Sequence, residues 1–465
     1  MFQRIIYHHE RERWSVSRLS KFVNILGLMM MLVLVTFHAS LGQDTVAGVE
    51  AKATDELLNY VDAPDDAFDW KLVNDDRKIF GVSIHHLKLT SQRWQGITWT
   101  HDLFVIEPPT ITHPEHMILF ITGGSNLKQP VDEDLSAGMT LATQSGARVA
   151  VLHQVPNQPL LDGRSEDDLI TETWLRYLDS GDASWPLLFP MVKSVVKTMD
   201  AVQAFAAEKQ WQPIKGFVTT GASKRGWTSW LAPAADGRII ATAPMVIDML
   251  NFSAQIKHQY AMWGAPSEQI HDYTSKGLIR EDGTPRPGRE ANLWAMMDPY
   301  SYRDRVPVPK LLVVGANDPY WTTDAMNQYW DELPGEKSIF RAANAGHGLE
   351  GSRERGIATI AAFFQRVVTA TPMPTLQWAF RPDVKAIAVE VTSDETPMKA
   401  MVWVARSPTM DFRKSVWQLE SLAQENAGWA GSVAIVPGEH VAVFAELFFV
   451  QGSVPYSLST LVHCQ

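Results

Sequence analysis

Short, continuously apolar runs that end near glycine recur along the middle of the chain and alternate with stretches of helical period. Such runs are typical of strands buried on both faces, as in parallel sheets. The clearest helical stretch, 191–207, keeps its apolar residues on one helical face, and 356–368 predicts a second helix. The expected strands are 117–121, 149–152, 217–220, 239–249, 311–314 and 339–342. This alternation predicts an α/β fold with a doubly wound, mostly parallel sheet.

Three regions depart from this alternation. The acidic stretch 55–70 predicts a loop, and strands are expected soon after it, at 82–89 and 99–106. The region 252–305 is irregular and rich in aromatic residues, and it predicts a lid-like insertion over the carboxyl ends of the strands, where α/β sites lie. After the proline-rich stretch at 371–374 the helical period is lost. We therefore expect a main α/β domain over 43–371 and a small antiparallel, sandwich-like β domain over 375–465.

The N-terminal end has the order typical of a secretory signal. Basic residues precede an apolar run from Phe22 to Phe37, and the small residues Ser40 and Gly42 follow it. The run is long for a signal and short for a spanning helix, which needs about 20 residues. A cleaved signal peptide and an uncleaved anchor therefore both stay open for 1–42. We expect a secreted or periplasmic protein, with membrane anchoring through this segment as the alternative.

Composition narrows the class of protein. The chain has 465 residues, of which 45% are hydrophobic and 20% charged, as in ordinary globular proteins. A net charge of −11 without a basic run argues against nucleic acid as a partner. The single cysteine, Cys464, excludes an intrachain disulfide and cysteine-rich zinc sites, and we expect neither a metal nor a cofactor.

The strongest candidate for chemistry is Ser223, which stands between an apolar strand and a helix-like stretch. The small residues Gly221 and Ala222 before it let the backbone turn sharply and expose the hydroxyl. The pattern departs from G-x-S-x-G, because Arg225 takes the second glycine position and Gly226 comes one residue later. An ordinary turn serine is the alternative interpretation, but the flanking strand and helix favour a nucleophile.

A serine hydroxyl needs a base to act as a nucleophile. The candidate base is His347, which lies between two glycines after an expected strand. The candidate acid is Asp318, at the end of the preceding strand, where it would orient the imidazole. The chain order Ser223, Asp318, His347 is that of the α/β-hydrolases, so we expect that fold. Asp248, after the strand that follows the serine, is an alternative acid.

Backbone N–H groups are the expected donors to an oxyanion. Lys224 directly follows the serine, and Gly123 and Gly124 lie in the loop after an earlier strand. An ordinary glycine turn is the alternative interpretation of that loop. The side chains of Lys224 and Arg225 either bind an anionic substrate group or are paired within the protein, and we favour the second interpretation.

Several ordered motifs occur from about Asp55 into the C-terminal region: WQGITWTHDLFVIEP, ITGGSN, GASKRGWTSW, DPYSYRDRV, PKLLVVGANDPYW, DELPGEK, NAGHG and SPTMDFRKSVWQ. Together they resemble those of the PhoPQ-activated pathogenicity-related protein family. The resemblance implies an α/β-hydrolase fold, export and a link to bacterial virulence regulation, and related secreted amoebal proteins act as growth-repressing signals. The G-x-S-[KR]-x-G pattern also resembles glucuronoyl esterases, which implies carbohydrate esters as one substrate class.

Two functions from different classes follow. The first is an exported serine hydrolase that acts on a small-molecule ester, a carbohydrate ester or a peptide. The second is a secreted signalling or binding protein on a hydrolase scaffold with little or no turnover, since fold alone does not imply function. A complete triad favours the enzyme, because a binding protein has no need of Ser223, Asp318 and His347 together.

Overall fold

The structure is a computed structural model, and it describes residues 54–130, 132–425 and 428–465. The leader expected at 1–42 lies outside the described residues. In the part of the chain that the structure describes, no helix has both the length and the apolar character needed to cross a membrane.

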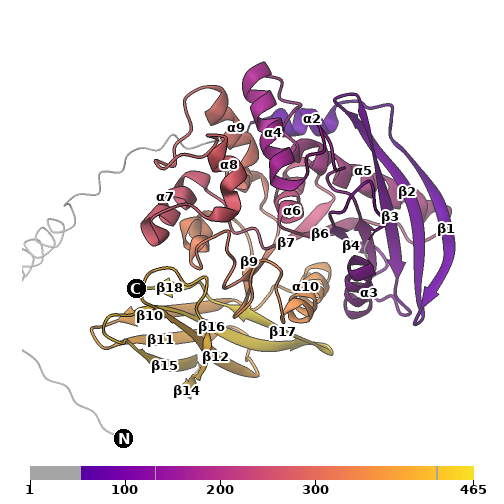
Figure 1. Cartoon of the computed structure of the whole chain (residues 1–465). Helices are drawn as coiled ribbons and strands as arrows, with labels where there is room; N and C mark the ends of the chain where they lie inside the picture. The colour runs from indigo at the N-terminus through magenta and orange to yellow at the C-terminus, as the bar shows by residue number, and fades with distance from the viewer. Residues whose placement is uncertain (1–53, 131, 426–427) are drawn as a thin grey trace, which may run out of the picture. The chain divides into compact units, whose positions relative to one another are not determined.

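A nine-stranded sheet runs through the first part of the chain (Figure 1). The strands lie in the order β1 (Asp69–Ile79), β2 (Val82–Trp94), β3 (Ile97–Glu107), β5 (Arg148–Leu152), β4 (His116–Ile121), β6 (Gly216–Ala222), β7 (Ile239–Met245), β8 (Lys310–Gly315) and β9 (Lys337–Ala342). Strands β4 to β9 pair in parallel, whereas β1, β2 and β3 are antiparallel and β3 pairs antiparallel with β5.

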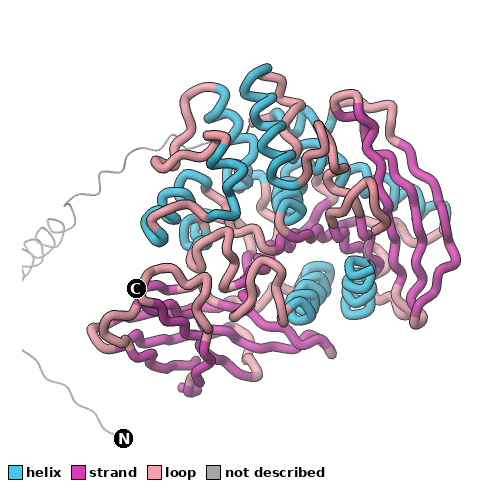
Figure 2. The backbone as a smooth tube through the Cα atoms, viewed as in Figure 1, coloured by secondary structure: helices cyan, strands magenta, loops and turns pink. Residues whose placement is uncertain are grey.

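Helices cover both faces of this sheet, as the alternation of side chains along β4 shows. Met117, Leu119 and Ile121 belong to one buried cluster, together with side chains of several helices, among them the three of a first group. Ile118 and Phe120 belong to a second cluster with two other helices. The first group comprises α4 (Glu166–Ser180), α5 (Leu188–Glu208) and α6 (Lys224–Ala235), and the second α3 (Asp132–Ser145) and α10 (Arg353–Val368). Figure 2 shows these helices against the strands, which confirms the expected doubly wound, mostly parallel sheet.

The aromatic-rich region after β7 forms a set of short helices near the carboxyl ends of the strands (Figure 1). These are α7 (Phe252–Trp263), η1 (Glu268–Ile270), α8 (His271–Ser275), α9 (Arg289–Met297) and η2 (Pro299–Arg305). The expected lid-like insertion is thus present. Two further short helices, η3 (Ala325–Gln328) and η4 (Trp330–Glu332), follow β8.

Two local expectations were wrong. The stretch 55–70 is not a loop, because it contains α2 (Glu56–Asp62) and the start of β1. Leu57 and Val61 are four residues apart and both buried, so a one-turn apolar contact anchors this helix among acidic neighbours. The strand expected at 239–249 ends at Met245, since the following residue has a positive φ of 45° and turns the chain.

Beyond α10 the described chain is built of antiparallel strands, as expected. One sheet has the strand order β10 (Leu376–Pro382), β11 (Ala386–Ser393), β15 (Gly428–Ala434) and β14 (Ala423–Glu425). The other sheet has the order β13 (Gln418–Ser421), β12 (Lys399–Ser407), β16 (His440–Gln451) and β17 (Val454–Ser459), and β18 (His463–Cys464) also pairs with β16. Their inner faces share one buried cluster with α10 and the main sheet. The boundaries at 371 and 375 therefore stay a prediction.

Candidate active site

Ser223 occupies a strained turn between β6 and α6. Its backbone has φ 58° and ψ −123°, a region that non-glycine residues rarely adopt and that clusters at functional sites. The Ser223 N–H donates to the Met245 carbonyl at 2.9 Å, so the turn is fixed to the neighbouring strand. The side chain therefore stands at the carboxyl end of β6, where its hydroxyl lines a pocket.

Two glycines make this turn possible. A Cβ atom added to Gly221 would lie 2.8 Å from the Ile121 carbonyl oxygen, and one added to Gly226 would lie 2.7 Å from the Met245 carbonyl oxygen. Any side chain at these positions would push α6 away from the strands beside it. The second glycine is needed at 226 rather than 225, because residue 226 is the one that approaches β7. This explains the departure from G-x-S-x-G.

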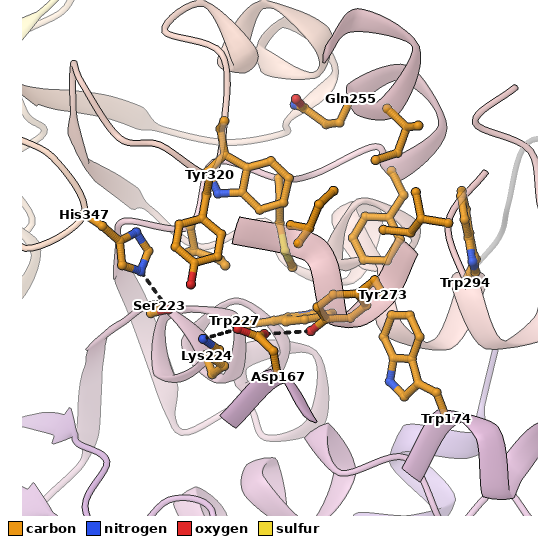
Figure 3. A pocket seen from close by; sticks show the side chains of 17 residues that line it. Asp167, Trp174, Ser223, Lys224, Trp227, Gln255, Tyr273, Trp294, Tyr320 and His347 are labelled. Atoms are coloured by element: carbon orange, nitrogen blue, oxygen red, sulfur yellow. Dashed lines mark hydrogen bonds and ion pairs between the residues drawn. The ribbon is translucent and has the colours of Figure 1, made fainter. Parts of the chain in front are cut away.

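The structure brings the three predicted residues together from three loops. His347 Nε2 lies 2.9 Å from Ser223 Oγ (Figure 3). On the other side of the ring, His347 Nδ1 lies 2.8 Å from Asp318 Oδ2. The other carboxylate oxygen of Asp318 accepts the Tyr320 backbone N–H at 2.9 Å. A proton on Nδ1 that is directed at Asp318 leaves Nε2 free to accept the Ser223 hydroxyl proton.

The alternative acid lies elsewhere. Asp248 is buried, and its Oδ1 accepts the Tyr329 hydroxyl at 2.6 Å. Burial raises the pKa of Asp248 to about 6, although Arg341 and the Tyr329 hydroxyl act in the opposite direction. The carboxylate that contacts His347 is that of Asp318.

His347 is held in place by two neighbouring residues that the sequence alone did not indicate. The Glu350 carboxylate accepts the backbone N–H of Gly346 at 2.9 Å and that of Gly348 at 3.1 Å, one on each side of the histidine. The Tyr320 ring lies against the imidazole, with ring centroids 4.3 Å apart. An acidic residue just after a Gly-His-Gly turn is a signal that points to the first of these contacts.

The predicted oxyanion donors lie on two segments. Lys224 is the first residue of α6, and the first N–H groups of a helix have no acceptor within it. Gly123 and Gly124 follow β4, and their carbonyls accept the Gln154 N–H at 2.7 Å and the Gln158 amide at 2.9 Å. Among the described residues that line the pocket, Lys224 is present and the two glycines are not. The oxyanion role of all three stays a prediction.

The two cationic side chains after Ser223 are paired within the protein. Lys224 Nζ lies 2.6 Å from Asp167 Oδ2, and Asp167 also accepts the Tyr273 hydroxyl at 3.0 Å. Burial disfavours the charged ammonium, but Asp167 more than offsets this, and the pKa of Lys224 is raised. Arg225 donates to both carboxylate oxygens of Glu166. These contacts come from α4 and α8, which the sequence analysis did not connect with the serine.

An aromatic pocket of about 60 Å³ opens beside Ser223 and His347. The lid helices α7, α8 and α9 supply part of its wall, and α4 and α6 supply another part (Figure 3). Residues in the loops after β7, β8 and β9 also line it. Its aromatic side chains include Trp174, Trp227, Phe252, Tyr273, Trp294 and Tyr320. Ser223, Lys224 and Asp167 lie at one end of the pocket, and the other lining residues are mainly aromatic or aliphatic, with Gln255 of α7 as a polar member of the wall. Nowhere in residues 54–130, 132–425 and 428–465 are three or more His, Cys, Asp or Glu side chains grouped to hold a metal ion.

A parallel sheet wound on both faces, with a serine turn after one strand and the acid and histidine loops after later strands, defines an α/β-hydrolase fold. Within that class, the chain belongs to the PhoPQ-activated pathogenicity-related protein family, whose model matches residues 57–413. It is 34% identical to "Autocrine proliferation repressor protein A" of Dictyostelium discoideum over 379 residues, which are 77% of this chain and 76% of that protein.

Solved structures with a similar fold include several esterases. Acetyl xylan esterase 1 from Thermoanaerobacterium sp. has a TM-score of 0.48 and 18% identity, over 69% of this chain and 96% of its own. An acetyl xylan esterase from Paenibacillus sp. R4 has a TM-score of 0.46 and 14% identity, over 69% of this chain and 95% of its own. An S-formylglutathione hydrolase from Agrobacterium tumefaciens has a TM-score of 0.42 and 14% identity, over 64% of this chain and 99% of its own.

Proposed function

We propose that this protein is an exported serine hydrolase that acts on an ester or a peptide. One observation carries the proposal: the imidazole of His347 is within hydrogen-bond distance of both Ser223 Oγ and Asp318 Oδ2. Nucleophile, base and orienting acid in this geometry are what acyl transfer requires.

In the proposed reaction, Ser223 Oγ attacks the acyl carbon while His347 Nε2 takes its proton. Asp318 keeps the proton on Nδ1 and stabilises the imidazolium that forms. The backbone N–H groups of Lys224 and of the 123–124 loop hold the developing oxyanion. His347 then gives its proton to the leaving group, and a water molecule, activated by the same imidazole, releases the acyl group from Ser223.

The pocket favours a short acyl group. Its volume of about 60 Å³ is well below the roughly 150 Å³ of an engineered apolar cavity that holds benzene. Aromatic walls suit a small apolar acyl chain, and a bulkier alcohol or amine has to leave on the open side of Ser223. Small-molecule esters and carbohydrate esters meet this requirement, and so does a peptide with a small residue before the scissile bond.

A signalling or binding function with little turnover is the second candidate. Its support is the relative named as an autocrine proliferation repressor, since repression of proliferation requires recognition and does not by itself require hydrolysis. The two functions make different demands on Ser223: a hydrolase needs its hydroxyl, whereas a binding protein tolerates its removal.

Covalent labelling separates the two functions. A fluorophosphonate probe should label the full chain, and Ser223→Ala should abolish labelling. The matched control is Ser136→Ala, an exposed serine on α3, which should label as the wild type does. A panel of p-nitrophenyl esters of increasing acyl length and of aminoacyl arylamides then distinguishes esterase from peptidase. A wild-type chain that neither labels nor hydrolyses any member of the panel would favour the binding protein.

A further inference from the structure

One motif of the sequence, SPTMDFRKSVWQ, has no place in the triad, yet part of it lies against both loops that carry the acid and the base. This part is the segment 411–417, the last part of the connection from β12 to β13 in the C-terminal antiparallel region. We call it the docking segment. Its contacts reach Asn317, directly before Asp318, and Asn344, three residues before His347.

The acid loop is attached through the side chain of Asn317. Its Nδ2 shares its two hydrogens among three carbonyl oxygens of the docking segment, those of Phe412 at 3.3 Å, Arg413 at 3.2 Å and Ser415 at 2.8 Å. The Asn317 backbone N–H meanwhile donates to the Ala345 carbonyl at 2.9 Å, so the acid loop is also joined to the histidine loop.

The histidine loop is attached by a reciprocal pair of hydrogen bonds. Asn344 Nδ2 donates to the Trp417 carbonyl at 2.9 Å, and the Trp417 N–H donates to Asn344 Oδ1 at 2.8 Å. Asn344 has a φ of 59°, a left-handed conformation that asparagine tolerates better than most residues. The side chain is therefore used as a double clamp at the point where the chain turns towards His347.

Apolar packing supports these hydrogen bonds. Phe412 and Trp417 are each 2% exposed and belong to a small buried cluster that includes Ala316 of the acid loop. The lid is attached to the same segment, because Arg413 donates to Glu268 at 3.0 Å and its guanidinium lies 4.0 Å from the centre of the Trp263 ring.

We propose that the docking segment positions Asp318 and His347, so that the C-terminal β region is a required part of the hydrolytic site. The histidine loop is rich in glycine, and the two loops lie so close that a Cβ on Gly315, at the end of β8, would be 2.4 Å from the Gly346 carbonyl oxygen. Loops of this kind need external contacts to hold two side chains in reacting geometry. Asn317 and Asn344 are then positioning residues. This inference rests on the proposed hydrolase function.

The test compares Asn317→Ala and Asn344→Gly with Asn327→Ala in the full chain. Glycine keeps the left-handed turn at 344 while it removes the clamp. Asn327 is the matched control, because its Nδ2 also donates to a C-terminal carbonyl, that of Val462 at 2.9 Å, but it neighbours neither the acid nor the base. We expect a fall in kcat and in the labelling rate of roughly 10- to 100-fold for the first two variants, with KM changed less than about twofold. The control should keep wild-type kcat.

A double variant shows whether Asn317 acts through the acid. Adding Asn317→Ala to Asp318→Asn should lower kcat little further, because residues that act as a unit are not additive. If the double variant instead lost kcat by the product of the two single-variant factors, the proposal would be contradicted. It would also be contradicted if Asn317→Ala and Asn344→Gly lowered only the unfolding temperature, while the labelling rate per folded molecule stayed equal to that of the wild type.

A spectroscopic readout keeps this inference separate from the proposed function. The His347 Nδ1 proton that is hydrogen-bonded to Asp318 should give a downfield proton NMR signal, assigned by its absence in His347→Ala. The signal should be lost or broadened in Asn317→Ala and kept in Asn327→Ala. If the wild type proves unreactive, the hydrolase proposal fails, and this signal alone decides whether the docking segment positions the pair.

Discussion

The Arg225 guanidinium and the Glu166 carboxylate form a two-pronged ion pair, with N–O distances of 2.7 and 2.9 Å. Arg225 Nε also donates to the Val155 carbonyl, and a Cβ on Gly123 would lie 2.6 Å from the guanidinium. One side chain therefore joins the start of α6, the start of α4 and the loop after β5, and it packs closely against Gly123 after β4. Arg225 thereby stabilises the turn at Ser223, and because its charge is paired with Glu166, it is not available to bind an anionic substrate group.

The first prediction concerns this ion pair. Glu166→Gln should destabilise the protein by roughly 1–3 kcal/mol, because it leaves a buried guanidinium without its carboxylate. Burial by itself raises the pKa of Glu166, but Arg225 more than offsets this and lowers it to about 2. Chemical unfolding of wild type and variant at a series of pH values measures the difference in the free energy of unfolding.

The pH dependence of that difference has a definite sign. The pKa of Glu166 is lower in the folded than in the unfolded chain, so its stabilising effect is complete above about pH 4.5 and is lost as the pH falls towards 2. The gap between wild type and Glu166→Gln should narrow over this window. A gap that stays constant from pH 5 to pH 2.5 would show that the carboxylate charge contributes nothing.

The second prediction separates the two candidate acids. Asp318→Asn should lower kcat by about 10⁴-fold, as removal of the orienting carboxylate does in serine proteases. Asp248→Asn should lower kcat far less, because Asp248 contacts Tyr329 and not the imidazole. Steady-state kinetics on any ester that the wild type hydrolyses decides the matter. A severe Asp248→Asn effect with a mild Asp318→Asn effect would reverse the assignment.

The third prediction tests the glycine requirement at the serine turn. Gly221→Ala should lower stability by roughly 1–3 kcal/mol or more, because its Cβ would lie within 2.9 Å of backbone atoms on two sides. Gly237→Ala is the control, since nothing lies within 4 Å of a Cβ at that position. Thermal unfolding should show a clear loss for the first variant and no loss for the second.

Ser223, Asp318 and His347 could be identified from the sequence because each follows an apolar run with glycines beside it. The carboxyl ends of parallel strands meet at one edge of a sheet, so the order of these runs was enough to group the three residues. The same argument could not choose between Asp318 and Asp248, because both follow parallel strands and only the loop conformations bring one of them to His347.

Other features of the site depend on packing between distant segments. Asp167, which pairs with Lys224, also meets Tyr273 because α4 lies against α8, and no periodicity in either helix indicates that contact. The short helix α2 was missed because only Leu57 and Val61 carry its apolar face. The role of the docking segment also needed the structure, since 27 residues separate Asn317 from Asn344, and Trp417 lies a further 73 residues along the chain.

The fourth prediction concerns export. If the apolar run from Phe22 to Phe37 is a signal, the mature chain should begin near Gln43 and be found outside the cytoplasm. N-terminal sequencing by mass spectrometry of secreted or periplasmic fractions checks this. Full-length protein in the membrane fraction would favour the uncleaved anchor, and full-length protein in the cytoplasm would contradict both.

The last prediction concerns the size of the acyl group. Trp294 on α9 is 5% exposed, lines the pocket and packs edge-on against Phe252, with ring centroids 5.8 Å apart. Trp294→Ala removes one of the tryptophans that line the pocket, so kcat/KM should shift from short towards longer acyl chains, at a stability cost of about 3–5 kcal/mol. Trp211→Ala is the control, because Trp211 stacks on Arg148 and does not line the pocket. It should leave the preference for acyl length unchanged. An unchanged preference in Trp294→Ala as well would mean that the acyl group binds outside this pocket, with the leaving group inside it.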